Sequence, residues 1–255
     1  MVRLGQNFLA DPNLLDAIVR ESGAGEGDVV LEIGGGEGAL TERLAAVAER
    51  VWVVEIDERL EGPLGAVADE HHNVEVVWGD AMEVELSALD PAPTRVVSNL
   101  PYSIATPLIL RTIAELPSVG EWTVMVQREI ADRLRAAPGS RTYGGPSATV
   151  QLSCEVEMVR AVDRAVFRPR PRVDSALLRL RRVAAAPAPG TAALIRGAFA
   201  HRRKTLAGSL ELAGLADRPR VREALAEMGL DVDARAESLP AKAFPVLAAR
   251  LGLGG

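Results

Sequence analysis

The stretch Val29-Val-Leu-Glu-Ile-Gly-Gly-Gly-Glu-Gly-Ala39 decides the fold, because an apolar run turns directly into closely spaced glycines. The run Val29–Ile33 predicts a buried strand, and the spacing of Leu40, Leu44 and Val47 predicts a helix after the glycines. Glycines at such a turn let a ligand approach the backbone at the start of the helix, where N–H groups favour negative charge. We therefore expect a strand, a ligand-binding loop and a helix.

The same alternation of short β-branched runs and helical patterns continues to about residue 180, which is typical of a parallel sheet wrapped by helices. The expected strands are Val29–Ile33, Val51–Glu55, Val74–Trp78, Arg95–Asn99, Trp122–Gln127, Gln151–Val159 and Ala176–Arg181. No convincing helix separates the last two, so they predict an antiparallel hairpin at the edge of the sheet. The fold class is thus α/β, with a seven-stranded, mostly parallel, doubly wound sheet.

Two segments interrupt this pattern. Residues 184–190, Ala-Ala-Ala-Pro-Ala-Pro-Gly, are typical of a linker, and only helical patterns follow them. We therefore expect one domain over residues 1–183 and a small all-α domain over residues 191–255. Residues 136–149 are rich in Gly, Pro and Ser and long for a plain connection, which favours a mobile functional loop over local disorder.

Polar residues follow the first three predicted strands. Gly34, Gly36 and Ala39 satisfy G-x-G-x-x-A, and Glu55 lies 19 residues after Gly36, where a carboxylate would accept hydrogen bonds from ribose hydroxyls. NAD and S-adenosylmethionine both need that arrangement, and these residues do not choose between them. Asp80, after the third strand, is expected beside Glu55 and could accept a hydrogen bond from an adenine amine.

The fourth strand ends in Asn99-Leu-Pro-Tyr102, which combines an amide, an exposed carbonyl and an aromatic plane. Pro101 pushes Leu100 into an extended conformation and turns its carbonyl away from regular hydrogen bonding. That carbonyl and the Asn99 side-chain oxygen could accept both N–H bonds of an exocyclic amine while Tyr102 stacks on the ring. A strand-to-helix turn with a buried tyrosine is the structural alternative.

Charge divides the chain into two halves. Residues 1–120 hold 7 Lys and Arg against 21 Asp and Glu, whereas residues 121–255 hold 22 against 14. The basic residues gather between Arg160 and Arg182, including Arg168, Arg170 and Arg172, and in a second cluster, Arg196, His201, Arg202, Arg203 and Lys204. Charge runs are often only solvated faces, yet two basic clusters beside an acidic half fit a nucleic-acid footprint.

Composition excludes other classes of site. The single cysteine, Cys154, and three histidines offer no metal-ligand spacing, so no metal is expected. The single cysteine and the polar start of the chain lead us to expect a cytoplasmic protein. No apolar run approaches the roughly 20 residues that span a bilayer, so no membrane partner is expected.

Several motifs together resemble the KsgA family of small-subunit rRNA adenine dimethyltransferases. They are Gly5–Leu9, Glu32–Thr41, Glu55–Asp57, Asn99–Tyr102, Val126–Ala131, Phe167–Ser175 and Ala198–Leu206. The first motif and Asn-Leu-Pro-Tyr are shared with the related Erm family, whereas the strand after Val173 and the Arg-Arg-Lys-Thr-Leu segment resemble KsgA more closely. Gly35 and Glu37 depart from the family, which more often has Pro and an apolar residue there, and the extension before Gly5 is nearly absent, which puts some RNA contacts in doubt.

The resemblance implies a Rossmann-like class I methyltransferase that uses S-adenosyl-L-methionine to dimethylate two adjacent adenosines near the 3′ end of small-subunit rRNA. It implies that Asn7, Leu9, Gly34 and Gly36 adjoin the cofactor, that Glu55 binds its ribose and Asp80 its adenine. The implied catalytic residues are Asn99, Leu100, Pro101, Tyr102 and, as a second ring opposite Tyr102, Phe167. The implied RNA contacts are Arg168, Arg170, Arg172, Arg202, Arg203 and Lys204. The family also suggests a monomer that acts on a partly assembled small subunit late in its biogenesis.

Three alternatives remain open. The same chemistry could act on large-subunit rRNA, as in the Erm family. A non-catalytic RNA-binding assembly factor could keep the fold, although it would have no reason to keep Glu55, Asp80 and Asn99–Tyr102. The glycine loop and Glu55 would also suit an NAD-dependent oxidoreductase.

Overall fold

The computed structural model describes residues 7–254, which form two compact units. The first unit comprises residues 7–131 and 156–182, and the second comprises residues 132–155 and 183–254. The expected boundaries at 183 and 191 place 132–155 with the sheet, whereas the structure groups these residues with the C-terminal helices. Among the described residues no helix is both long and apolar enough to cross a membrane.

A seven-stranded sheet forms the centre of the first unit, in the order β4-β3-β2-β5-β6-β9-β7. Its strands are β2 (Val29–Ile33), β3 (Arg50–Glu55), β4 (Val74–Trp78), β5 (Arg95–Asn99), β6 (Glu121–Gln127), β7 (Cys154–Val162) and β9 (Ser175–Arg182). The first five are parallel, and β9 pairs antiparallel with β6. The chain leaves β2 toward β3 and β4 on one side and returns to β5 and β6 on the other. The predicted α/β sheet with an antiparallel edge pair is confirmed.

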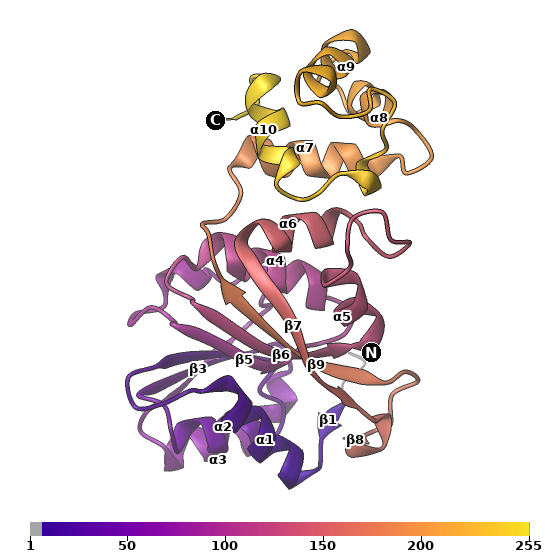
Figure 1. Ribbon diagram of the computed structural model, residues 1–255. Helices are drawn as coiled ribbons and strands as arrows, with labels where there is room; N and C mark the ends of the chain where they lie inside the picture. Colours follow the sequence, from indigo (N-terminus) through magenta and orange to yellow (C-terminus); the bar gives the residue numbers. More distant parts are fainter. Residues whose placement is uncertain (1–6, 255) are drawn as a thin grey trace. The chain divides into compact units, whose positions relative to one another are not determined.

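Helices α1 (Pro12–Ser22), α2 (Ala39–Ala45) and α3 (Glu61–Glu70) lie on one face of the sheet, and α4 (Ala105–Glu115) lies on the other (Figure 1). Asp11 caps α1, because its side chain accepts hydrogen bonds from the N–H groups of Asn13 and Leu14. Short helical turns η1 (Glu58–Leu60) and η2 (Leu86–Ala88) complete the connections, and α5 (Arg128–Leu134) follows β6 directly.

A second, two-stranded sheet pairs β1 (Phe8–Leu9) with β8 (Phe167–Arg168), which follows the short turn η3 (Arg164–Val166). Phe8 lies opposite Arg168 and Leu9 opposite Phe167. This pairing joins two segments almost 160 positions apart in the chain, and neither strand is long enough to give a sequence signal.

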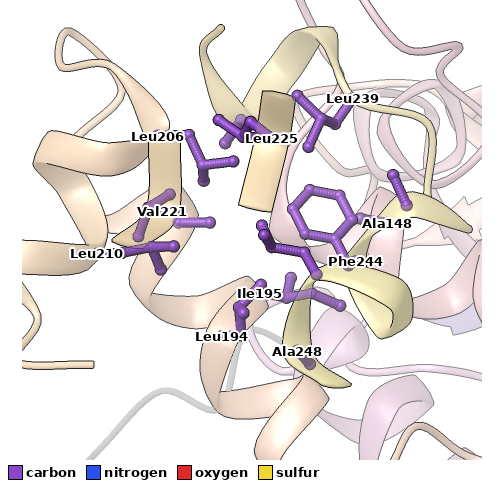
Figure 2. Close-up of a cluster of buried hydrophobic side chains, with 14 of the residues drawn as sticks. Ala148, Leu194, Ile195, Leu206, Leu210, Val221, Leu225, Leu239, Phe244 and Ala248 are labelled. Carbon is purple, nitrogen blue, oxygen red and sulfur yellow. The ribbon is translucent and has the colours of Figure 1, made fainter. Parts of the chain in front are cut away.

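The second unit is helical, with α6 (Gly145–Ser153), α7 (Pro189–Ala200), α8 (Leu206–Leu212), α9 (Arg218–Glu227), the turn η4 (Ala236–Ser238) and α10 (Ala243–Arg250). In its core, Phe244 of α10 packs with leucine and isoleucine side chains of α7, α8 and α9, as Figure 2 shows. Ala148 of α6 belongs to the same core.

Two expectations between β6 and β7 are corrected. Residues 136–149 are not a mobile loop throughout, because α6 begins at Gly145 and Tyr143 is fully buried against Phe199, with ring centroids 5.9 Å apart. The strand expected at Gln151–Val159 begins at Cys154, because Gln151 still belongs to α6. The packing of Tyr143 and Ala148 on the helical core supplies the order that this Gly- and Pro-rich composition does not.

Candidate functional site

The carboxyl ends of β2, β3, β4 and β5 surround a cavity of about 260 Å³ in the first unit. Such ends, where the strand order reverses, are where open α/β sheets bind ligands. The lining residues are Asn7, Phe8, Ile33, Gly34, Gly36, Val54, Glu55, Ile56, Gly79, Asp80, Ala81, Asn99, Leu100, Pro101, Tyr102, Ser103 and Ile104. The structure therefore brings the predicted residues of all four strand ends into one site.

The glycine-rich loop forms one wall of the cavity in a conformation that requires glycine. Gly34 and Gly36 have φ of +83° and +59°, in the left-handed region. A Cβ atom at Gly36 would lie 3.1 Å from the Phe8 ring, and one at Gly34 would lie 3.6 Å from the Pro101 ring. At Gly36 a Cβ atom would be tight against Phe8, whereas at Gly34 the contact with Pro101 would be ordinary and the positive φ alone requires glycine.

The Glu55 carboxylate lies at the end of β3 and anchors this loop. One oxygen, Oε2, accepts the Gly36 N–H at 3.0 Å, and the other, Oε1, accepts the N–H groups of Ile56 and Asp57, each at 2.9 Å. Since a carboxylate offers about four acceptor sites, Oε2 retains one for a ligand hydroxyl. Glu55 thus both shapes the cavity and offers it one acceptor.

Asp80 follows β4 after Gly79. The Met82 N–H donates to its Oδ1 at 2.8 Å, which fixes the carboxylate. No described residue donates to Oδ2, so that oxygen is the one available to an amine in the cavity. Asp80 and Glu55 are therefore two acceptors on neighbouring strand ends.

The Asn99 side chain has one amide atom that is hydrogen-bonded within the described part of the chain and one that is not. Its Nδ2 donates to the Asn7 carbonyl at 3.0 Å, which fixes the orientation of the amide. Its Oδ1 is buried and accepts no hydrogen bond from any described residue. A buried acceptor without a donor destabilises the fold by about 1–3 kcal/mol, so its presence calls for an explanation such as a role in the site. The amide therefore presents an acceptor to a ligand that carries an N–H group.

Tyr102, which lines the same cavity as Asn99, packs against the ring of Phe167. The ring centroids of Tyr102 and Phe167 are 6.4 Å apart, but the planes meet at 76°, edge to face. Phe167 is 2% exposed and does not line the cavity, so no slot between parallel rings exists in this structure. A base held between both rings would require one of them to turn. The sandwich role of Phe167 thus stays a prediction.

The other predicted residues lie as follows. Leu100 lines the cavity and its N–H donates to the Met125 carbonyl at 3.2 Å. Leu9 is buried in the apolar core instead of lining the cavity. Arg168, Arg170 and Arg172 are exposed in the first unit, and Arg202, Arg203 and Lys204 are exposed in the second. Gly5 and Gln6 lie outside the described residues. No group suited to a metal ion occurs in the described part of the chain.

Sequence reasoning missed three residues that act on the site. Phe8 lines the cavity through the β1–β8 pairing, and Ser175 on β9 shares a hydrogen bond with the Tyr102 hydroxyl. Glu32 is buried beneath the glycine-rich loop, where its Oε2 accepts the Thr41 hydroxyl at 2.6 Å. Burial raises the pKa of Glu32 to about 8, the Thr41 hydroxyl opposes this, and the charge of Glu55 adds to it. All three residues lie within motifs of the family resemblance, Gly5–Leu9, Glu32–Thr41 and Phe167–Ser175, but the sequence assigned no role to them.

Comparison with known proteins gives one family for nearly the whole chain. The profile of the family described as ribosomal RNA adenine dimethylase matches residues 2–250. A protein of Rhodococcus opacus named ribosomal RNA small subunit methyltransferase A is 44% identical to this chain. The match covers 97% of this chain and 87% of the length of that protein. A protein of the same name from Deinococcus radiodurans is 42% identical over 98% of this chain and 85% of its own.

Two solved structures share the fold. A dimethyladenosine transferase from Plasmodium falciparum superposes with a TM-score of 0.78 at 26% identity and covers 96% of this chain and 98% of its own. The 23S rRNA methyltransferase ErmE superposes with a TM-score of 0.70 at 30% identity, over 96% of this chain and 100% of its own. Both likenesses extend over both units of the chain.

Proposed function

Because the chain belongs to the ribosomal RNA adenine dimethylase family, we propose that it dimethylates the N6 amines of two adjacent adenosines near the 3′ end of small-subunit rRNA. The single observation that carries the proposal within the site is the Asn99 side chain, which lines the cavity and whose buried Oδ1 accepts no hydrogen bond from the described residues. An acceptor of this kind suits an exocyclic amine, whose N–H groups would satisfy it.

The proposed methyl donor is S-adenosyl-L-methionine, and the wall formed by Gly34, Gly36, Glu55 and Asp80 fits it. The glycines leave room against the backbone, Glu55 Oε2 has one acceptor site for a ribose hydroxyl, and Asp80 Oδ2 could accept from the adenine amine. Asn7 adjoins this wall because its carbonyl accepts from Asn99. We place Leu9 outside direct contact, since it is buried in the core.

The chemistry follows from the properties of the amine. An adenine N6 nitrogen is a weak nucleophile because its lone pair is delocalised into the ring. Acceptance of its two N–H bonds by Asn99 Oδ1 and the Leu100 carbonyl would favour a pyramidal nitrogen with a localised lone pair. When bound, S-adenosyl-L-methionine supplies an electrophilic methyl carbon. Rate enhancement then comes mainly from alignment, and no strong base is needed because the nitrogen becomes acidic once it carries the new methyl group.

The target must leave its stack in the RNA to reach Asn99. Unstacking costs a few kcal/mol, which stacking on the Tyr102 ring would offset by about 1–3 kcal/mol. We propose that the exposed Arg168, Arg170 and Arg172 of the first unit and Arg202, Arg203 and Lys204 of the second bind RNA phosphates. We further propose that the substrate is a partly assembled small subunit in the cytoplasm and that the protein acts as a monomer.

Methyl incorporation tests this function. Small and large ribosomal subunits from cells that lack the modification are incubated separately with the protein and labelled S-adenosyl-L-methionine, and the labelled nucleosides are identified. Dimethyladenosine in small-subunit rRNA is expected. Label confined to large-subunit RNA would instead favour a 23S rRNA methyltransferase, as ErmE is named. RNA binding without any label would favour a non-catalytic assembly factor.

A matched pair of variants tests the cofactor wall. Glu55→Ala removes the acceptor in the cavity, so the affinity for S-adenosyl-L-methionine in calorimetry should fall by about 1.5–3 kcal/mol, with RNA affinity retained. Glu58→Ala makes the same charge change on an exposed residue of η1 and should leave cofactor affinity unchanged. Equal affinity in both variants would contradict the assignment of Glu55, and binding of NAD instead of the sulfonium compound would favour an oxidoreductase.

A further inference from the structure

The Tyr102 hydroxyl has one hydrogen-bonding partner in the described part of the chain, the Ser175 hydroxyl on β9. The two residues lie 73 positions apart in sequence. Ser175 is fully buried, whereas the Tyr102 ring is only partly buried and lines the cavity. A hydrogen bond thus joins a ring of the site to a fixed point of the sheet.

Ser175 is held in place by the sheet itself. It is the first residue of β9 and lies opposite Gln127 at the end of β6, in antiparallel register. The preceding residue, Asp174, accepts the Arg128 N–H through its carbonyl at 3.0 Å. The backbone on both sides of Ser175 is therefore fixed, and its hydroxyl is a rigid anchor.

The orientation of a tyrosine ring depends on two torsions, χ1 and a broad χ2. The hydroxyl oxygen lies on the axis about which χ2 turns, so a hydrogen bond there fixes the far end of this axis and restrains χ1. The edge contact with Phe167 limits the ring from one side only. Without the anchor, the ring axis could swing about χ1 and move the ring from its place in the cavity wall.

We propose that Ser175 is a positioning residue, which holds the Tyr102 ring at the place in the cavity where the target adenine stacks. This inference rests on the proposed function, because it names the base that the ring receives. Ser175 does not line the cavity, so it acts through Tyr102 alone.

The anchor predicts a spectroscopic change that does not depend on activity. The chain contains two tyrosines, so protein labelled with ¹³C at tyrosine Cζ gives two signals, which Tyr143→Phe assigns. In Ser175→Ala the Tyr102 signal should shift and the Tyr143 signal should stay. An unmoved Tyr102 signal would overturn the proposal, whatever RNA the protein modifies.

A double-mutant cycle tests the consequence for catalysis. Ser175→Ala and Tyr102→Phe each remove the same hydrogen bond, so each should lower kcat/KM for RNA by about 3- to 10-fold, and the double variant should lose no more than either. The affinity for S-adenosyl-L-methionine should stay within about twofold in all three, since Ser175 does not line the cavity. Independent, multiplying losses would overturn the proposal.

The control is Ser22→Ala, which removes another buried hydroxyl of the first unit, bonded to the Val19 carbonyl at 2.7 Å. It should lower stability as Ser175→Ala does, yet leave kcat/KM unchanged. An equal loss of kcat/KM in both would show a merely structural effect and overturn the proposal. Failure of the wild-type protein to methylate small-subunit rRNA would contradict the proposed function, whereas the tyrosine signals would still decide on the anchor.

Discussion

Glu32 shows how one residue links the site to the stability of the fold. It is 1% exposed, and its hydrogen bond to Thr41 joins the end of β2 to α2 beneath the glycine-rich loop. Burial is the main cause that raises the pKa of Glu32 from 4.5 to about 8, against the Thr41 hydrogen bond and with the negative charge of Glu55. At neutral pH the folded protein thus keeps a proton on Glu32 that the unfolded chain releases.

The sign of the pH dependence follows. Because the folded pKa is raised, the stabilisation is complete below about pH 4.5 and is lost as the pH rises toward about 8. Glu32→Gln keeps an acceptor for Thr41 but cannot ionise. Urea unfolding at about pH 5 and about pH 8 should therefore show a loss of stability in the wild type, at most about 1.4 kcal/mol per pH unit, that the variant lacks. Parallel pH profiles would contradict this account of Glu32.

Single residues also mark the limit of sequence reasoning at the site. Gly34, Glu55, Asp80 and Asn99 could be predicted to meet because each lies at the carboxyl end of a predicted parallel strand. The partner of Tyr102 could not, because Ser175 is 73 positions away and its strand was expected to begin one residue later. Local sequence patterns predict which strand ends converge. A side-chain contact between distant segments can be predicted only when the register of the strands in the sheet is known.

At the scale of elements, Gly35 sets how closely the loop before α2 approaches β3. A Cβ atom at Gly35 would lie 2.4 Å from Cγ1 of Val53 and 3.2 Å from both methyl groups of Leu64. Val53 is fully buried in β3, so it has no free space to move into. With Val53 and Leu64 in these places, position 35 has no room for a side chain.

A double substitution tests that packing. Gly35→Ala should lower the free energy of unfolding by about 1–3 kcal/mol, because it overpacks a buried contact. Adding Val53→Ala removes the Val53 methyl groups that it meets, so the loss in the double variant should be smaller than the sum of the two single losses. Urea unfolding of the four proteins measures this coupling. Additive losses would show that the Val53 side chain does not limit the loop.

Elements with a strong periodic signal could be predicted from sequence, and those stabilised by distant packing could not. β2, β4 and β5 have the expected bounds because their apolar runs are bordered by turn residues. Helix α6 has Gly145 and Pro146 in its first turn, where proline is favourable, and it is stabilised because Ala148 packs into the core of the second unit, which no local pattern indicates. The pairing of β1 with β8 joins strands of two residues each, which have no periodicity to detect.

At the scale of the whole molecule, basic residues are distributed over both units. The exposed triplet Arg168, Arg170 and Arg172 belongs to the first unit, and the triplet Arg202, Arg203 and Lys204 belongs to the second. The second unit also exposes Arg218, Arg222 and Arg250, each of which pairs with an acidic side chain: Glu211, Asp233 and Glu227. These three residues provide a control, because their charge is already matched.

Replacement of either basic triplet by alanine should weaken RNA binding and lower its salt dependence. Each phosphate contact contributes about 0.7–0.9 to the slope of log K against log salt, so a triplet that makes three contacts should lower the slope by about 2–3. Affinity for S-adenosyl-L-methionine should not change, since neither triplet lines the cavity. Replacement of Arg218, Arg222 and Arg250 changes the net charge equally and should alter the slope much less, because all three are ion-paired, whereas in the two basic triplets only Arg170 lies near a carboxylate of a described residue, that of Asp163 at 3.9 Å. If the control triplet lowers the slope as much as the others, RNA responds only to the overall charge of the protein, and the two triplets are not its contacts. If only one of the two basic triplets lowers it, RNA binding belongs to that unit alone.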